Sequence, residues 1–332
     1  MTRALDEAPA SQRWLDRFPK DQDVALISEN RPYFHPEGAY DDQYGIQAAD
    51  ESGRGIANLL KKFDSDLSGP VLELGCGTGK ATVGLCKSGA FPWYLVTDSS
   101  KTFIDITRTK LTRNGVPLAS VRFAVFADTD LDRLPAASLS AIVLRSVLHH
   151  FTDVPRWIEA AARTLRPGGT LIFEEPCSPG YLLMGVIAKM AATLPGSGLK
   201  PQECEQAAYL AETMKAYHRR DVDKSTWEDK HVFRPDEMML WGRNAGLVTH
   251  FLPNSTFDSY AHSADPEIGR MDFEKFVREY LQYCMGFGEQ AAARITAAGR
   301  PYLQYVAEAC GGTSEPYLLG TFLLQKPRRG TA

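Results

Sequence analysis

The chain has 332 residues, of which 44% are hydrophobic and 23% charged, and this composition excludes global disorder. Its 37 lysines and arginines against 41 acidic residues give a formal net charge of -4, so no nucleic-acid partner is expected. The length predicts about two units, and we favour one α/β core with a helical insertion over two separate domains.

No segment is typical of a membrane or secreted protein. The first residues have no apolar run like that of a signal peptide, and the most apolar stretch, 181–194, contains Lys189 and is shorter than a bilayer requires. The six cysteines form no C-x-x-C pair, which argues against both a zinc site and a disulfide framework. We therefore expect reduced cysteines, no metal, no membrane partner and a cytoplasmic location.

Strand and helix signals alternate from about residue 70 to residue 176, which predicts a parallel sheet. The expected strands are 71–74, 94–97, 121–126, 141–144 and 170–173. The expected helices cover about 80–88, 101–114 and 154–165. A breaker, Arg166-Pro167-Gly168-Gly169, ends the last of these helices.

Further along the chain, a helix is expected from about 235 to Gly246, with strands at 248–252 and 317–324. Together these elements predict an open, doubly wound α/β sheet of seven strands with helical cap insertions. The expected organisation is an N-terminal helical lid or arm (1–69), a core (70–176), a helical cap insertion (177–232) and the rest of the core (233–332), which has a helical insertion at about 257–316.

The two helical insertions carry apolar stripes at helical spacing. Such stripes pack inward in most proteins, but the helices could also cap the carboxyl ends of the strands or form a homodimer interface. Their aromatic and thioether side chains could wall an apolar pocket. That set is Tyr209, Met214, Tyr217, Trp227, Tyr260, Phe273, Phe276, Tyr280, Tyr283 and Met285.

A glycine-rich turn follows the first strand of the core. It reads Glu73-Leu74-Gly75-Cys76-Gly77-Thr78-Gly79, and its three alternate glycines allow a sharp turn beside a ligand. The dinucleotide pattern G-x-G-x-x-G fails in both registers, because Lys80 and Thr82 occupy the sixth positions. The P-loop pattern fails as well, because Ala81 follows Lys80.

The remaining pattern, E-x-G-x-G-x-G, resembles that of the class I S-adenosylmethionine (SAM) dependent methyltransferases, particularly the small-molecule branch with the ubiquinone and menaquinone C-methyltransferases. Four further elements match in order over about a hundred residues. They are Asp98, Asp128 with Leu134-Pro135, Leu148-His149-His150-Phe151, and Leu165-Arg166-Pro167-Gly168-Gly169. The resemblance implies a Rossmann-like fold and SAM as the cofactor.

The resemblance also implies which residues hold the cofactor. The glycine loop supplies Gly75, Cys76, Gly77 and Gly79. Asp98, with Ser99 beside it, is suited to accept hydrogen bonds from both ribose hydroxyls. Asp128, with Thr129, is suited to the adenine amino group, although the acidic run 128–132 leaves open which carboxylate is used, and a helix N-cap is the competing role.

Three other residues have alternative roles. Glu73 lies near the methionine ammonium or the glycine loop if it follows the family, and otherwise makes a structural hydrogen bond. Arg145 departs from the small residue usual in the family, and would pair with an anionic substrate group or with Glu174. Tyr44 closes an aromatic segment, 33–44, that is either a lid over the methyl donor or an arm packed on the core.

Methyl transfer from a sulfonium needs orientation above all, but oxygen and carbon acceptors also lose a proton. His149 and His150 are the candidate bases, and because the motif recurs whatever the acceptor, one of them is expected to cap a helix or pack; His218 and His231 are further candidates. The predicted function is methylation of a small, partly hydrophobic metabolite on oxygen or carbon in specialised metabolism. The alternatives are a non-methylating enzyme of this fold and a non-catalytic SAM-binding protein.

Overall fold

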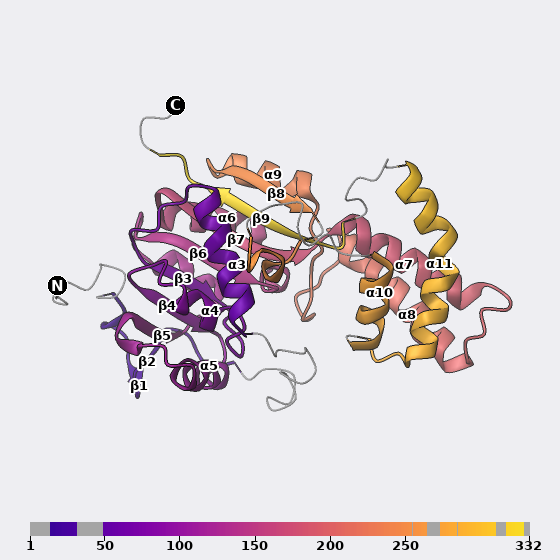
Figure 1. The fold of residues 1–332 in the computed structure, drawn as a ribbon, viewed down its shortest axis with the longest axis horizontal. Coiled ribbons are helices and arrows are strands. Elements are labelled where there is room, and N and C mark those ends of the chain that lie inside the picture. The colour runs from indigo at the N-terminus through magenta and orange to yellow at the C-terminus, as the bar shows by residue number, and fades with distance from the viewer. Residues whose placement is uncertain are drawn as a thin grey trace.

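The protein is described by a computed structural model over residues 14–31, 49–253, 255–263, 273–283, 285–309 and 317–328. Its centre is a nine-stranded sheet (Figure 1). The strands are β1 (Lys20–Asp21), β2 (Val24–Leu26), β3 (Val71–Leu74), β4 (Tyr94–Asp98), β5 (Val121–Val125), β6 (Leu139–Arg145), β7 (Leu165–Pro176), β8 (Val248–Pro253) and β9 (Leu319–Gln325). Their order across the sheet is β1-β2-β5-β4-β3-β6-β7-β9-β8.

The pairing confirms an open, mostly parallel sheet. The neighbouring strands from β2 to β7 are parallel, and β9 lies antiparallel between β7 and β8. The chain winds outward from β3 through β4 to β5, and then returns to continue on the other side of β3 with β6 and β7. This reversal makes the carboxyl ends of β3 and β6 a topological switch point, where open α/β sheets bind ligands.

All seven predicted strands are present, and two more are found near the N-terminus. β1 and β2 have two and three residues, which is too short for a periodic hydrophobic pattern. They extend the sheet beyond β5, so that part of the segment predicted as a helical arm is a sheet edge.

Helices cover both faces of the sheet. On one face lie α3 (Ala49–Lys62), α4 (Thr82–Lys87) and α5 (Lys101–Arg113); on the other lie α6 (Val154–Thr164) and α9 (Pro235–Asn244). Alternate residues of each strand enter the two cores: Leu72 and Leu74 belong to one, and Val71 to the other. This three-layer arrangement is the doubly wound architecture predicted from the sequence.

Strand β7 is longer than predicted. The Arg-Pro-Gly-Gly sequence does end α6, but the strand begins at Leu165, five positions before the predicted start at 170. Gly168 adopts a φ of +81°, a backbone conformation that glycine allows within this segment. The pairing with β6 shifts register at the same place, between Leu139 and Ala141 of β6. β7 is therefore a long strand of twelve residues, and Glu174 and Glu175 lie near its carboxyl end.

Four helices form a separate lobe with its own core. They are α7 (Ser178–Thr193), α8 (Pro201–His218), α10 (Phe273–Tyr283) and α11 (Glu289–Ala309), grouped beside the sheet in Figure 1. Ile187, Leu210, Met214, Val277 and Ile295 are buried in this core, so the stripes of the two insertions pack on one another. Among the described residues, no helix combines the length and the hydropathy that a membrane span requires.

Candidate functional site

A cavity of about 680 Å³ opens at the switch point. This volume lies within the range of about 300–1,000 Å³ typical of small-molecule sites. Eight of the residues predicted from the sequence line it: Gly75, Gly77, Asp98, Ser99, Asp128, Thr129, Arg145 and His150. Glu73, Cys76, Gly79 and His149 are outside its lining, and Tyr44 lies outside the described residues.

The glycine loop needs its glycines for two reasons. Gly75, Gly77 and Gly79 all adopt positive φ, at 72°, 51° and 89°. A Cβ on Gly75 would lie 2.5 Å from Val147 Cγ2, whereas a Cβ on Gly77 would meet no atom within 4 Å. The loop is therefore packed on one side and open toward the cavity at Gly77, where a ligand can approach the backbone.

Asp98, at the end of β4, links the glycine loop to the cavity. Its Oδ2 accepts a hydrogen bond from the Gly77 N–H at 2.9 Å, and its Oδ1 accepts one from the Ser100 N–H at 2.9 Å. Burial raises the pKa of Asp98 to about 6, against the effect of these backbone hydrogen bonds. Each oxygen retains a lone pair, so the carboxylate can accept two further hydrogen bonds from a ligand diol.

The structure separates the carboxylates of the acidic run. Asp130 is buried and accepts hydrogen bonds from the Ala127 N–H at 2.8 Å and from the Ser28 hydroxyl. It therefore takes the capping role that the sequence left open for this run. Asp128 and Asp132 line the cavity instead, together with Thr129.

Glu73 is buried behind the glycine loop. Burial raises its pKa to about 8, with the nearby Asp98 adding to the effect and Thr82 opposing it. Its Oε2 has no hydrogen-bond partner among the described residues. A buried acceptor without a partner is costly, so this oxygen suits a cationic donor brought by a ligand.

Together these groups fit a nucleoside with a cationic tail, such as SAM. The open backbone at Gly77, the two remaining acceptor sites of Asp98 and the unpartnered Glu73 oxygen are the three features that carry this fit. Cys76 is buried within the loop, and it is unpaired, as are Cys86, Cys177 and Cys204.

The two histidines at the end of β6 have opposite environments. His149 lies between two carboxylates, with Nδ1 2.6 Å from Glu175 Oε2 and Nε2 3.3 Å from Asp229 Oδ1. Burial alone would lower the pKa of His149, but Glu175 and Asp229 outweigh it and raise that pKa to about 10. His149 is therefore an imidazolium at neutral pH, with both N–H groups engaged.

His150 is the neutral member of the pair and lines the cavity. Its Nδ1 lies 3.0 Å from the Glu228 carbonyl oxygen, to which it donates, so Nε2 carries the lone pair. Burial and the charge of His149, whose ring centroid is 4.1 Å away, lower the pKa of His150 to about 4. Among the described residues, none forms a hydrogen bond with Nε2.

Asp229 and Glu228 belong to the connector, which we define as residues 219–234 between α8 and α9. Its middle is bound to the histidine segment, since the Lys230 N–H donates to the His149 carbonyl oxygen at 2.9 Å. Its Ser225 and Lys230 line the cavity. The connector is therefore a wall of the site supplied by a segment that the sequence analysis assigned to the cap insertion.

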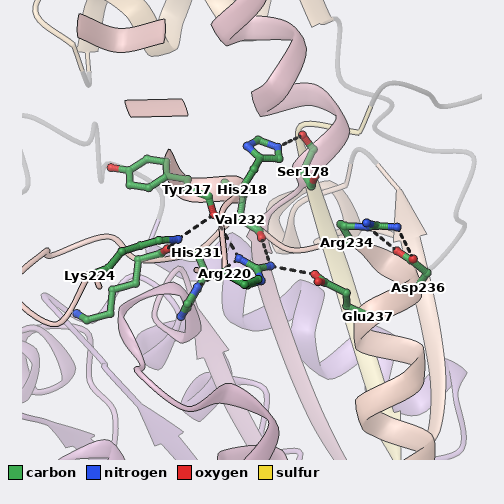
Figure 2. A network of polar contacts seen from close by, with 11 residues as sticks. Ser178, Tyr217, His218, Arg220, Lys224, His231, Val232, Arg234, Asp236 and Glu237 are labelled. Carbon is green, nitrogen blue, oxygen red and sulfur yellow. Dashed lines mark hydrogen bonds and ion pairs between the residues drawn. The ribbon is translucent and has the colours of Figure 1, made fainter. Parts of the chain in front are cut away.

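Two cationic side chains of the connector, Arg220 and Lys224, hold it in place (Figure 2). Lys224 Nζ donates to the Tyr217 carbonyl oxygen at 3.2 Å, and Arg220 Nη2 donates to the Val232 carbonyl oxygen at 3.0 Å and pairs with Glu237 at 2.9 Å. His218 Nε2 lies 2.8 Å from the Ser178 carbonyl oxygen. His231 Nδ1 lies 3.4 Å from Arg220 Nη1, so both His218 and His231 belong to this network, and neither is in the cavity lining.

Glu175 holds the histidine segment in place. It is fully buried, and its Oε1 accepts hydrogen bonds from the N–H groups of Val147 and Leu148 at 2.8 and 2.6 Å. Its Oε2 pairs with His149. Only Glu174 was predicted from the sequence; the acidic pair at the carboxyl end of the fifth predicted strand was the available signal for Glu175.

Replacing Glu175 by Gln is expected to lower the free energy of unfolding by about 3–5 kcal/mol, because it leaves the His149 imidazolium without its buried counter-charge. The measurement is chemical denaturation, with the exposed Glu159→Gln as the control.

The pKa of His149 is about 10 in the folded protein and lies near 6.5 in the unfolded chain. Its stabilisation is therefore complete below about pH 6.5 and lost as the pH rises through about 10. A wild-type stability that does not fall between pH 7 and pH 10, relative to His149→Gln, would contradict this assignment.

Arg145 lines the cavity at the end of β6, and its ion pairs are long. Nη2 is 3.5 Å from Glu174 Oε1 and 3.5 Å from Asp258 Oδ2. Its Nε is buried and has no hydrogen-bond partner among the described residues. Ser146, the next residue, adopts a φ of +53°, which is uncommon outside glycine and is typical of functional sites.

The predicted aromatic wall is wrong for the residues that can be described. Tyr209 is 68% exposed, Tyr260 is buried under the sheet and Met214 lies in the core of the helical lobe. The helices of the two insertions pack against each other, which removes these side chains from the cavity. Its apolar surface comes instead from Leu74, Phe103, Phe126, Val147, Phe151, Trp157 and Ala160.

Comparisons with known proteins agree with the geometry. A family profile described as "Methyltransferase domain" matches residues 72–173. The reducing polyketide synthase Preu2 of Preussia isomera is 31% identical over 121 residues, which are 35% of this chain and 5% of that protein. The ubiquinone/menaquinone biosynthesis C-methyltransferase UbiE of Vibrio cholerae is 26% identical over 238 residues, covering 68% of this chain and 87% of that protein.

A similar solved structure is that of phosphoethanolamine N-methyltransferase 2 from Haemonchus contortus, in complex with phosphomonomethylethanolamine and S-adenosylhomocysteine. Its TM-score is 0.46 at 14% identity, with 88% of this chain and 57% of that chain covered.

Proposed function

Because the chain belongs to the class I SAM-dependent methyltransferases, we propose that it methylates a small, partly hydrophobic metabolite on a carbon or oxygen atom that must first lose a proton. The observation that carries the proposal is the pair of adjacent histidines, of which His149 lies between the Glu175 and Asp229 carboxylates and His150 lines the cavity. Two neighbouring titratable groups whose pKa values are driven apart are typical of acid–base sites.

The cavity supports an acceptor of this kind. Phe126, Phe151 and Trp157 provide apolar surface, while His150 and Lys230 provide polar groups beside it. Apolar side chains and polar or charged groups thus share the lining, which suits a small molecule that has both kinds of surface. The relative from Vibrio cholerae is also consistent with carbon methylation in biosynthesis, since it is named a ubiquinone/menaquinone biosynthesis C-methyltransferase.

The proposed cofactor contacts follow the groups that fit SAM. Asp98, with Ser99, takes the ribose; Asp128, with Thr129, takes the adenine; and the glycine loop, with Glu73 behind it, takes the methionine part. When bound, SAM supplies an electrophilic methyl group on a good leaving group. The protein then has to orient the acceptor, exclude water and remove a proton.

We assign proton removal to His150. Its Nε2 accepts the proton from the acceptor, and the resulting imidazolium is stabilised through Nδ1, which lies 3.4 Å from Asp229 Oδ1. His149 keeps its proton throughout, and its charge keeps His150 neutral until the acceptor arrives. His149 is thus a positioning residue in this proposal, and His150 is the catalytic base.

The direct test is product analysis with a panel of small metabolites. Methyl transfer yields S-adenosylhomocysteine and a methylated product in equal amounts, and the position of an isotopically labelled methyl group identifies the acceptor atom. The proposal predicts carbon or oxygen methylation of at least one apolar small molecule. Turnover only with protein or polymeric substrates would contradict it, and a changed acceptor with intact SAM would favour a non-methylating reaction instead.

The pH dependence of SAM binding provides an independent prediction. The pKa of Asp98 is about 6 in the ligand-free protein, and only the ionised carboxylate can accept from both ribose hydroxyls. SAM affinity is therefore expected to be constant above about pH 7 and to fall by up to about tenfold per pH unit below about pH 6. Isothermal titration across this range measures the effect. An affinity that is flat down to pH 5 would exclude Asp98 as an ionised acceptor.

A further inference from the structure

We propose that Arg145 binds a carboxylate group of a ligand at the glycine-loop side of the cavity, and that the nearby positive charge of Lys80 strengthens this binding. Arg145 is the last residue of β6, and Lys80 follows the last glycine of the loop. The two cations share one neighbour, Asp258, whose Oδ2 is 3.5 Å from Arg145 Nη2 and 3.6 Å from Lys80 Nζ. The inference rests on the proposed function, because it concerns a ligand of the same cavity.

The cations of this cluster are incompletely paired. Charge-assisted hydrogen bonds from a guanidinium are usually about 2.7–2.9 Å long, whereas Arg145 makes only contacts of 3.5 Å. Its buried Nε has no partner among the described residues. A guanidinium that lines a cavity with free donors is suited to a planar anion that accepts two parallel hydrogen bonds.

The carboxylates of the cluster, in contrast, are held by other donors. Glu174 Oε2 accepts from the Phe257 N–H at 2.6 Å, and Asp258 Oδ1 accepts from the Ser52 hydroxyl. Glu174 and Asp258 are therefore fixed by the α3 and η5 (Phe257–Tyr260) side of the fold, independently of Arg145. They leave the guanidinium available for a ligand.

The charge balance indicates a carboxylate and argues against a phosphate. Arg145 and Lys80 carry two positive charges, and Glu174 and Asp258 bring two negative ones close by. Burial and the charge of Arg145 lower the pKa of Lys80, whereas burial raises that of Glu174. A single negative charge would relieve the repulsion between the cations, but a dianion would face both resident carboxylates.

A carboxylate could come from two sources, the methionine part of SAM or the methyl acceptor. Titration with SAM and with decarboxylated SAM separates them, because the two differ only in that group. If SAM supplies the carboxylate, the wild type binds SAM at least about tenfold more tightly than decarboxylated SAM. Arg145→Gln then loses this preference, and its affinity for decarboxylated SAM is nearly unchanged. Arg145→Lys should recover part of the preference, because it keeps the charge without the fork.

If the acceptor supplies the carboxylate, Arg145→Gln binds both cofactors as the wild type does. In that case butyrate, a monocarboxylate used as a probe on the S-adenosylhomocysteine complex and observed by saturation-transfer NMR, binds the wild type and not Arg145→Gln. Arg156→Gln is the matched control, since Arg156 also lines the cavity but is 75% exposed and lies 3.6 Å from Asp132. It should keep the preference.

The proposal is overturned if Arg145→Gln changes neither the preference for SAM nor the binding of butyrate. Thermal unfolding of each variant shows that it is folded, and Lys80→Gln provides a second variant, which should weaken the same preference less. All of these readouts are binding measurements. A failure of the carboxylate site is therefore distinguishable from a failure to find a methyl acceptor.

Discussion

His150→Gln is expected to lower kcat by about 10²–10⁴-fold with little change in SAM affinity, because it removes the base and leaves the cofactor contacts in place. Glutamine retains a donor that can reach the Glu228 carbonyl oxygen, so the connector should remain attached. The measurement is single-turnover kinetics with an acceptor found in the metabolite panel. Titration with S-adenosylhomocysteine checks that the cofactor site is intact.

A spectroscopic readout needs no acceptor. The pKa of His150 is about 4 and that of His149 about 10, so ¹⁵N NMR of the imidazole nitrogens should show one neutral and one charged ring from pH 5 to pH 9. In His149→Gln, the neighbouring positive charge is lost and the pKa of His150 should rise toward its usual value. If His149→Gln abolishes turnover while His150→Gln leaves it intact, the two roles are reversed.

Asp98→Ala is expected to weaken SAM binding by about 2–4 kcal/mol, or about 30- to 1,000-fold, because two hydrogen bonds from the ribose to a charged acceptor are lost. The side chain also accepts from the Gly77 N–H, so part of the effect would act through the glycine loop. Isothermal titration with SAM gives the total. NAD should give no signal with the wild type.

Comparing two ligands that differ only in one ribose hydroxyl tests the ribose contact by itself. In the wild type, 5′-methylthioadenosine should bind more tightly than its 2′-deoxy analogue, and Asp98→Ala should remove this difference. Asp132→Ala is the control, because Asp132 also lines the cavity but does not contact the glycine loop in any described hydrogen bond. If Asp98→Ala keeps the preference for the 2′-hydroxyl, Asp98 does not bind the ribose.

The sheet was predictable because each central strand is a short apolar run followed by a turn or breaker. β3 matches its predicted range of 71–74, and β4 and β5 differ from theirs by one residue. β7 was predicted too short, because residues 166–169 are typical of a loop, whereas Leu165 before them pairs with Leu139 of β6 across a register shift. Such a partner is a tertiary effect that no local window contains.

The site was predictable where a residue lies at the carboxyl end of a strand or within a few residues after it. Gly77, Asp98, Asp128 and His150 are all of this kind, and all line the cavity. Asp229 follows no strand and lies in a polar stretch between two helices, where nothing in the local pattern indicates that it contacts His149. It comes close only because the connector returns from the helical lobe to the sheet, and this path depends on long-range packing.

The position of β9 also constrains the order in which the protein can be completed during synthesis. β9 is the last strand of the described chain, yet it lies between β7 and β8 and pairs with both. Until residues 319–325 leave the ribosome, β7 exposes an unpaired edge that is prone to association with other strands. Glu174 and Glu175 lie in the part of β7 that pairs with β9. These two carboxylates, which contact Arg145 and His149, are therefore among the last groups of the site to reach their final positions.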